Sequence, residues 1–446
     1  MIKKLKSVFL NPSEGAYRLR QIAYTGLSSI AAKGINAIVT LISVPLAYNY
    51  LGEERYGLMM IVLSVVSMLH FADLGLGFSL QNKLPTLLQE ESKLQLKKYI
   101  SSTFLLLVGV SVFLVLCLSL SWSYINWSEV LNVKGDLANS EAETSVLVFV
   151  LCFLISLPLS IIQKIQNGYQ KAYYNEAFKA VGNLLGLLLL VFFIRQNQGV
   201  PFLILAIYGS VTLSLMGNFI YKLFWKDSAL APKLKYLDAS CFKELFNDGV
   251  KFFIIQVMSI LTIALDSLII ARYISAEAVA GYNIGFRIVM LLMIPSLAFI
   301  SPMLFAFNDA IAKNDKAWVV NASRKAVKVC LALSVTLSLL LLLGGNLFIK
   351  LWIGCHAMLD FTLITAFAVY IFFYNFNNLF STIMLSDQFL KYCFLYYPIA
   401  AITSFILKVV LIKTIGIPGV LYGTVIGITI LFILPSSIIL RKLKYL

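Results

Sequence analysis

Long apolar stretches recur along the whole chain, and short polar stretches separate them. An α-helix needs about 20 mostly apolar residues to cross a bilayer, and twelve stretches meet this requirement. The longest polar stretch, about 222–251, leaves no room for a soluble domain between the helices. The pattern predicts twelve membrane-spanning helices, close to residues 21–51, 56–82, 99–122, 143–166, 175–195, 200–222, 249–272, 278–308, 322–345, 358–386, 391–415 and 417–440.

The longest polar stretch divides the predicted helices into two sets of six. We expect an N-terminal six-helix lobe at 1–222, a cytoplasmic linker at 223–248 and a C-terminal six-helix lobe at 249–446. A shift of 224 residues places Asn49–Glu53 over Tyr273–Glu277, and each segment is a tight turn after the first helix of its half. This alignment favours an internal parallel repeat.

Composition and charge agree with a membrane protein and give it an orientation. Hydrophobic residues make up 60% of the chain and charged residues 13%, against about 25% charged residues in soluble domains. If the N-terminus is inside, 27 of the 36 Lys and Arg residues fall on inner segments and six on outer ones. Positive charge gathers on cytoplasmic segments, so both termini are predicted to be cytoplasmic. The net charge of +15 then reflects topology and not nucleic-acid binding.

The first two predicted helices contain ionisable residues at membrane depth, namely Lys33, His70 and Asp73. Such a residue costs about 2.5–3.5 kcal/mol on insertion scales, so it usually faces a polar cavity or a partner. Lys33 and Asp73 lie at similar predicted depths, and His70 shares a helix face with Asp73. Two hypotheses remain open: a charged cluster that lines a cavity, or a Lys33–Asp73 ion pair that fixes helix packing.

The second half contains a comparable set of charges. Asp266 and Arg287 lie on the seventh and eighth predicted helices, and Lys408 lies on the eleventh. Arg suits bidentate binding of phosphate or carboxylate, so Arg287 is a candidate substrate-binding residue. The alternative is an Arg287–Asp266 ion pair. Lys408 either faces a lumen or extends its ammonium to the membrane surface.

Two further features concern metals and backbone flexibility. The chain has only two His residues, and its six Cys residues show no metal-binding spacing, so we expect no metal centre and no cofactor. The sequence Asp73-Leu74-Gly75-Leu76-Gly77 is not a phosphate-binding loop, because no strand precedes it. Its glycines favour close helix approach or a flexible inner gate.

The first hundred residues resemble the start of bacterial O-antigen flippases, which belong to the multidrug/oligosaccharidyl-lipid/polysaccharide exporter superfamily. The segments that carry the resemblance are Lys33-Gly34-Ile35-Asn36, Pro45-Leu46, Tyr50-Leu51-Gly52-Glu53-Glu54-Arg55-Tyr56-Gly57 and Phe71-Ala72-Asp73-Leu74-Gly75-Leu76-Gly77.

The resemblance implies an all-α fold of twelve helices in two lobes around a central lumen. It also implies translocation of an undecaprenyl-diphosphate-linked oligosaccharide across the cytoplasmic (inner) membrane, with no enzymatic activity. Relatives tend to have a cationic lumen, and Lys33 and Arg287 are the positions best suited to it here, with Lys408 as a third candidate. Expected partners are the lipid-linked oligosaccharide, membrane lipids, the O-antigen polymerase and glycosyltransferases.

The expected mechanism is alternating access driven by an ion gradient. His70, Asp73 and Asp266 are the candidate residues for a coupling ion, either H+ or Na+. One alternative is a drug or cation antiporter of the same superfamily, for which acidic lumen residues would be expected. Another is a membrane O-antigen polymerase or glycosyltransferase, but the longest predicted outer loop, near 123–142, is short for such an enzyme.

Overall fold

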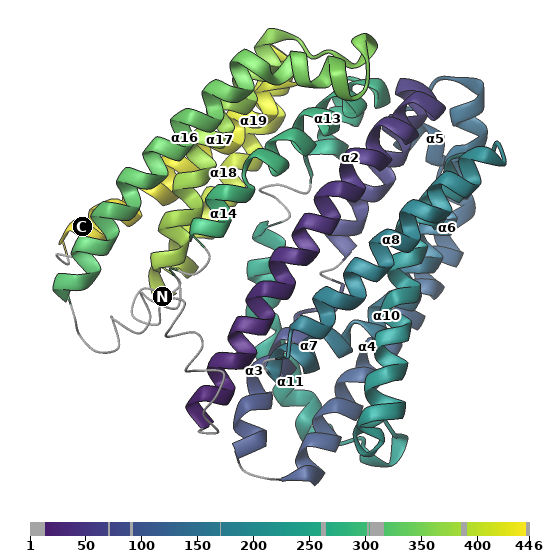
Figure 1. Cartoon of the computed structure of the whole chain (residues 1–446). Helices are drawn as coiled ribbons and strands as arrows, with labels where there is room; N and C mark the ends of the chain where they lie inside the picture. Colours follow the sequence, from purple (N-terminus) through teal and green to yellow (C-terminus); the bar gives the residue numbers. More distant parts are fainter. Residues whose placement is uncertain are drawn as a thin grey trace. The chain divides into compact units, whose positions relative to one another are not determined.

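The structure of the protein is a computed structural model, shown in Figure 1. It describes residues 14–69, 72–89, 92–169, 171–259, 265–300, 303, 316–384 and 390–442. Every regular element in these ranges is a helix, and eight of the helices are long and apolar enough to cross a membrane. The chain is therefore an all-helical, multi-pass membrane protein, as the hydrophobic pattern predicts.

The chain divides into two compact units. The first unit comprises residues 1–50, 66–128 and 139–256, and the second comprises 51–65, 129–138 and 257–446. The whole polar stretch at 223–248 falls within the first unit. The predicted boundaries of two six-helix lobes stay a prediction.

The predicted opening hairpin corresponds to one long helix that is interrupted at a single residue. Helix α2 runs over Glu14–Leu69, but Gly52 has φ 75° and ψ 175° inside it. Glycine adopts positive φ without the steric penalty that other residues meet. The predicted turn at 49–57 is therefore a sharp break at Gly52. Gly57 then lies so close to the main-chain carbonyl of Ala276 that a Cβ atom would sit 1.9 Å from the oxygen.

The predicted second helix, 56–82, does not continue unbroken. Residues 72–75 form a turn in which Leu74 has φ 52° and Gly75 has φ 73°. The backbone amide of Leu76 closes this turn by donating to the carbonyl of Asp73 (2.9 Å). Helix α3, Leu76–Gln89, begins there. The prediction was wrong because hydropathy does not report the left-handed backbone at Leu74 and Gly75.

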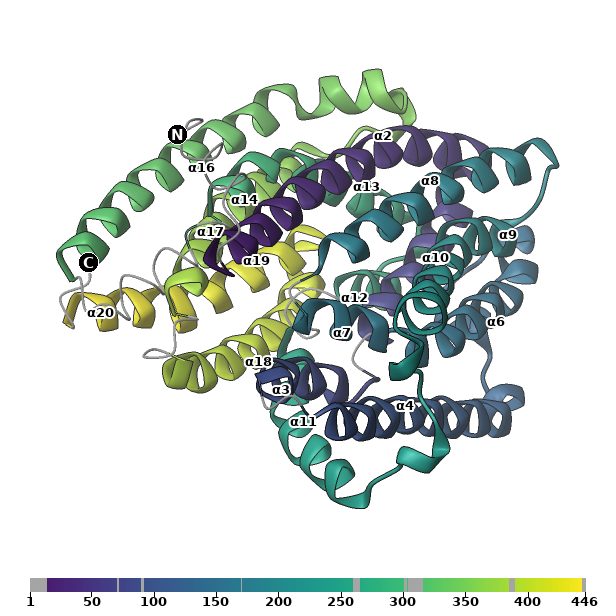
Figure 2. The same ribbon diagram turned by 60° about the horizontal axis from the view of Figure 1, so that its bottom comes forward.

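The helices of the first unit pack side by side in pairs, most clearly α8 with α10 and α3 with both α4 and α7 (Figures 1 and 2). A π-helical stretch, Leu205–Gly209, joins α9 to α10. The bounds are α4 Lys93–Ser121, α6 Asp136–Leu159, α7 Ile161–Gly168, α8 Tyr173–Arg195, α9 Val200–Ile204, α10 Ser210–Ile220 and α11 Ala239–Ser259.

The second unit is built around α16, α17, α18 and α19, where α18 packs along α19 and α16 along α17 (Figure 1). The helix predicted at 278–308 is divided into α13, which ends at Leu292, and α14, which begins at Ile294. The last part of the predicted range lies largely outside the described residues. The bounds are α12 Asp266–Tyr273, α13 Ala276–Leu292, α14 Ile294–Ile300, α16 Lys316–Trp352, α17 Phe361–Met384, α18 Leu390–Ile415, α19 Pro418–Ile428 and α20 Leu434–Lys442.

Amide side chains join the helices of the first unit. Gln166 on α7 donates to Asn218 on α10 at 2.6 Å, and Asn218 donates back at 3.2 Å. Asn218 also donates to Asn175 on α8, which in turn donates to Asn167 on α7. Hydrogen bonds between membrane helices contribute about 0.6–2 kcal/mol each. This network holds α7, α8 and α10 together.

Segments that were predicted to lie on the same membrane face contact one another. In the second unit, the carboxylate of Glu54 accepts hydrogen bonds from the backbone amides of Lys134 (2.7 Å) and Gly135 (2.8 Å). The amide of Asn132 donates to the carbonyl of Ala271 at 2.7 Å. Three predicted outer turns therefore meet at one place.

The polar stretch before α11 is held against α3 and α4 within the first unit. Lys83 on α3 pairs with Glu244 and lies 3.4 Å from Asp248, while Lys98 on α4 pairs with Asp238 at 2.8 Å. The hydroxyl of Tyr99 donates to Glu244. We call these residues of α3, α4 and the segment 238–248 the polar clasp.

The polar clasp should lose its contribution to stability in acid. Hydrogen bonds from Lys83 and Tyr99 hold the pKa of Glu244 below its ordinary value of 4.5, and bonds from Lys98 and Ser240 hold the pKa of Asp238 below 3.8. Because both pKa values are depressed in the folded state, the contribution is present above the ordinary values and is lost as the pH falls through the folded ones.

We therefore expect Glu244→Gln to lower the Tm of the purified protein at pH 7, and this difference from wild type to shrink toward pH 3. Thermal unfolding in detergent across that range measures it. The exposed carboxylate Asp360 provides the matched control, and Asp360→Asn should leave the Tm nearly unchanged. An equal Tm for wild type and Glu244→Gln at pH 7 would contradict this role of the clasp.

Candidate functional site: two polar clusters among the helices

A polar cavity of about 280 Å³ lies among the helices of the first unit. Its polar lining comes from the turn before α3, from the α6–α7 region and from the α9–α10 region, and apolar side chains complete the walls. The polar residues are Asp73, Ser156, Ser160, Gln163, Lys164, Tyr208 and Thr212. A cavity that presents both signs of charge and several hydroxyl groups can hold a polar group or an ion at the depth of apolar helices.

Asp73 is almost fully buried, with 3% of its surface exposed. Its carboxylate accepts a hydrogen bond from the backbone amide of Gly75 at 2.9 Å, directly before α3 begins. A negative charge at a helix N-terminus is stabilised by the helix dipole. Asp73 therefore has a structural role in the turn and also contributes to the cavity wall.

Lys164 on α7 supplies the positive charge in the same cavity. Its ammonium lies 3.2 Å from the centroid of the Phe78 ring, within the range of a cation–π contact, and it is attracted by the Asp73 carboxylate. Gly77 gives both side chains room, because a Cβ there would lie 2.8 Å from Asp73 Oδ2 and 3.0 Å from Lys164. The glycine thus allows the two charges to share one wall.

Sequence reasoning missed Lys164, because its position near the end of a predicted helix assigned it to an inner loop. A signal was present: Phe153, Ser156, Ser160 and Lys164 follow one another at spacings of three or four, which places them on one helix face. The small polar residues on this face distinguish it from a purely lipid-facing stripe.

The second polar cluster lies within the second unit and centres on Asp266. Lys408 on α18 pairs with its carboxylate at 2.5 Å, and the hydroxyl of Tyr282 on α13 donates to it at 2.7 Å. Lys408 is fully buried and Asp266 is 4% exposed. The backbone of Gly423 on α19 packs against Lys408, where a Cβ would lie 2.6 Å from the Lys408 backbone nitrogen. An ion pair thus joins α12 to α18, and a hydrogen bond joins α13 to the same carboxylate.

This geometry corrects two expectations about the second half. The ion pair of Asp266 is with Lys408, whereas Arg287 has no carboxylate within 4 Å among the described residues. The hypothesis that Lys408 extends its ammonium to the membrane surface was wrong, because this ammonium is buried beside the Asp266 carboxylate. Arg287 is partly buried on α13 and lies near Tyr56, and its role as a substrate contact stays a prediction.

The structure describes the two remaining candidate residues, Lys33 and His70, only in part or not at all. The backbone of Lys33 belongs to α2, but its side chain lies outside what the structure describes, as does all of His70. The proposed Lys33–Asp73 proximity therefore stays a prediction. Among the described residues, no group of three or more His, Cys, Asp or Glu side chains is arranged to hold a metal ion.

Several solved structures share this fold. One is an inward-facing multidrug resistance MATE family transporter of the MOP superfamily, with a TM-score of 0.77, 17% identity, and coverage of 93% of this chain and 99% of that one. A MOP superfamily transporter from Pyrococcus furiosus has a TM-score of 0.67, 17% identity, and coverage of 97% and 99%. The class defined by the fold is thus a multi-pass, MATE-like membrane protein.

The family follows from the sequence. Residues 23–302 match the family described as "Polysaccharide biosynthesis protein", and the chain belongs to this family. A protein of Salmonella typhi named as a candidate O-antigen transporter is 23% identical over 263 residues, which are 58% of this chain and 59% of that protein. A candidate O-antigen export protein of Yersinia pseudotuberculosis is 23% identical over 263 residues, 58% of each chain.

The matched region thus spans about three fifths of each of these two relatives. The resemblance to O-antigen transporters, which the opening segment indicates, is confirmed by the family match and by these similarities.

Proposed function

We propose that the protein is a flippase that moves an undecaprenyl-diphosphate-linked oligosaccharide, an O-antigen or similar repeat unit, from the inner to the outer leaflet of the cytoplasmic membrane. The observation that carries this proposal is the match of residues 23–302 to the polysaccharide biosynthesis family in a multi-pass chain with a MATE-like fold. Relatives named for O-antigen transport and export support it.

The proposed architecture is twelve membrane helices in two six-helix lobes, 1–222 and 249–446, around a lumen that opens alternately to each side. Both termini are proposed to be cytoplasmic. Two observations support the order of membrane crossings that the charge distribution predicts. Predicted outer turns contact one another at Glu54 and Asn132, and predicted inner segments contact one another in the polar clasp.

The proposed contacts to the substrate diphosphate are Lys33 and Arg287. Arg287 is partly buried and has no ion-pair partner among the described residues, so its guanidinium does not have to leave a carboxylate to bind phosphate. Lys408 is bound to Asp266, and we assign it a packing role in this conformation. Asp73, His70 and Asp266 remain the proposed residues for a coupling H+ or Na+.

Reconstitution of the purified chain in liposomes with a fluorescent undecaprenyl-diphosphate oligosaccharide tests this model. Lys33→Ala and Arg287→Ala should each slow translocation by about tenfold, the equivalent of about 1.4 kcal/mol, because each removes a charge-assisted hydrogen bond to phosphate. Arg272→Ala is the matched control, since Arg272 is exposed in the same unit, and it should transport at the wild-type rate.

The possible outcomes distinguish an error in the assigned residues from an error in the proposed function. If both site variants translocate the lipid as fast as wild type at equal protein levels, the assignment of Lys33 and Arg287 is wrong and the flippase proposal stands. If the wild-type protein itself gives no translocation above protein-free liposomes, the functional proposal is wrong.

A further inference from the structure

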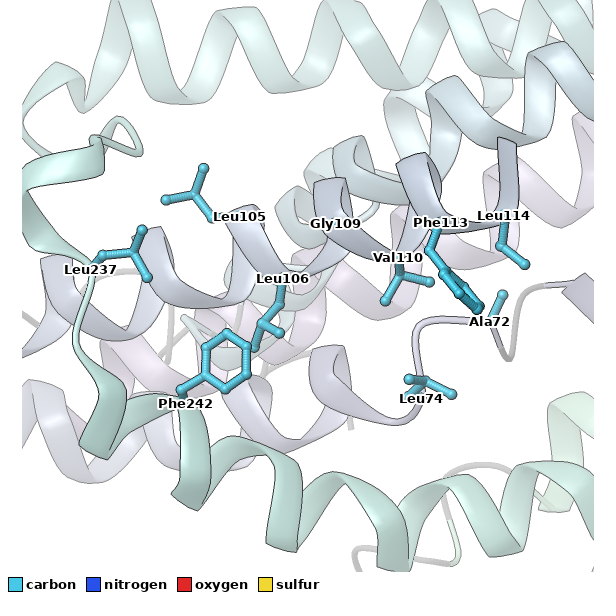
Figure 3. Close-up of a pocket in the computed structure, with 10 residues that line it drawn as sticks. All are labelled: Ala72, Leu74, Leu105, Leu106, Gly109, Val110, Phe113, Leu114, Leu237 and Phe242. Atoms are coloured by element: carbon cyan, nitrogen blue, oxygen red, sulfur yellow. The ribbon is translucent and has the colours of Figure 1, made fainter. Parts of the chain in front are cut away.

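A second cavity of the first unit has the opposite character to the polar one. It is an apolar groove of about 550 Å³, lined by Ala72, Leu74, Leu105, Leu106, Gly109, Val110, Phe113, Leu114, Leu237 and Phe242. Figure 3 shows the side chains of α4 along one side, with Leu74 on the turn before α3 and Phe242 of α11 facing them. The turn 72–75 lies between the two cavities, because Ala72 and Leu74 line the apolar groove while Asp73 lines the polar cavity.

The groove has the length of one bilayer leaflet. Its wall on α4 extends from Leu105 to Leu114, which is about 14 Å at 1.5 Å per residue. The hydrocarbon core of a bilayer is about 30 Å thick, so one leaflet is about half of that. A single hydrocarbon chain of a membrane lipid therefore fits the groove from end to end.

Two lysines lie beside the residue that precedes Leu237 at one end of the groove, and we call this end its mouth. The ammonium groups of Lys97 and Lys235 lie 5.7 and 5.0 Å from the centroid of the Tyr236 ring, and Tyr236 directly precedes the lining residue Leu237. Neither lysine has a carboxylate within 4 Å among the described residues. Lys97 is eight residues from Leu105, about 12 Å along α4 toward the N-terminus of the helix.

The polar stretch that carries Lys235 and Tyr236 is held against α4 by hydrogen bonds and an ion pair. The hydroxyl groups of Ser101 and Ser102 on α4 accept hydrogen bonds from the backbone amides of Lys233 (3.2 Å) and Asp238 (3.3 Å). The Lys98–Asp238 ion pair lies beside them. The groove and its two lysines thus belong to one packed structure and not to a loose surface.

We propose that the groove binds one anionic phospholipid of the membrane, with a hydrocarbon chain between α4 and α11 and its phosphate at Lys97 and Lys235. Basic pockets beside membrane helices bind anionic headgroups in this way. The site needs only a bilayer, so it is independent of the proposed flippase activity. The bound lipid would fasten the segment 233–242 to α4.

Gly109 permits a direct test, because a Cβ there would meet no atom within 4 Å. Gly109→Phe places a ring in the groove without a backbone clash, and Gly109→Leu does the same with a smaller side chain. Val112→Phe is the matched control, since Val112 is exposed on α4 outside the groove. Native mass spectrometry of the delipidated full chain, titrated with phosphatidylglycerol or phosphatidylcholine of identical chains, measures binding.

We expect wild type and Val112→Phe to bind one phosphatidylglycerol at least about tenfold more tightly than phosphatidylcholine, a difference equivalent to about 1.4 kcal/mol. Both Gly109 variants should bind phosphatidylglycerol at least about tenfold more weakly, and Lys97→Gln/Lys235→Gln should abolish the preference for the anionic lipid. Equal binding of the two lipids by wild type would overturn the proposal. Wild-type affinity in a folded Gly109 variant, or displacement of phosphatidylglycerol by equimolar undecaprenyl phosphate, would also overturn it.

Discussion

Replacing Lys408 with alanine is expected to lower the free energy of unfolding by about 3–5 kcal/mol, the cost of removing one partner of a buried ion pair. The variant leaves the Asp266 carboxylate among apolar helices with only the hydroxyl of Tyr282 as a partner in the described cluster. It also opens a cavity beside Gly423, where α19 packs against the Lys408 backbone. Thermal and chemical unfolding of the purified protein in detergent measures this loss.

A double variant separates the effect of the lost charge from the effect of the lost side-chain volume. Asp266→Asn/Lys408→Met removes both charges, keeps an acceptor for Tyr282 and nearly preserves the volume of the lysine. Because apolar replacement of a buried pair is often neutral or stabilising, we expect it to recover most of the stability that Lys408→Ala loses. If Lys408→Ala unfolds at the wild-type Tm, the pair does not hold the second unit together.

Gly75→Ala is expected to prevent stable folding of the first unit. Gly75 has φ 73°, and its Cβ would lie 2.1 Å from the carbonyl oxygen of Gly249. The left-handed backbone alone costs a non-glycine residue about 1–2 kcal/mol. The clash is with main-chain atoms of α11, so the alanine fits only if α11 moves away from the turn, which would disturb the polar clasp.

The control for this effect is Gly344→Ala on α16, where a Cβ would meet no atom within 4 Å. Alanine at such a helical position should be neutral or stabilise by about 0.5–1 kcal/mol. Yield and Tm of the two variants in detergent, compared with wild type, measure the difference. Equal yield and Tm for Gly75→Ala and Gly344→Ala would show that the contact with Gly249 is not required.

The helical membrane fold was predictable from the sequence because apolar runs of about 20 residues are typical of membrane-spanning helices. Breaks inside those runs were not predictable. Leu74 and Leu76 are as apolar as the residues around them, so the left-handed turn at Leu74 and Gly75 left no trace in the hydropathy. The glycines of this segment did indicate a close approach, and Gly75 does lie against Gly249.

The candidate site was only partly predictable, because ion pairing depends on contacts between distant helices. Asp266 and Lys408 are 142 residues apart in the chain, and two basic residues, Arg287 and Lys408, were available at membrane depth on the predicted helices of the second half. Helix packing decides between them, and no local pattern encodes that choice. Lys164 was missed for a related reason. Its position close to the end of a predicted helix suggested an exposed loop, whereas in the fold its side chain lines the same cavity as Asp73.

We propose that the chain carries a glycan headgroup on a polyprenyl diphosphate across the bilayer. The most direct test is the rate at which a fluorescent undecaprenyl-diphosphate oligosaccharide, placed in both leaflets of sealed proteoliposomes, becomes accessible to an impermeant quencher added outside. We predict that wild-type protein exposes the inner-leaflet pool at least about tenfold faster than protein-free liposomes, a rate difference equivalent to about 1.4 kcal/mol in barrier height. Equal rates with and without the folded protein, under both H+ and Na+ gradients, would show that the protein is not a flippase for this lipid.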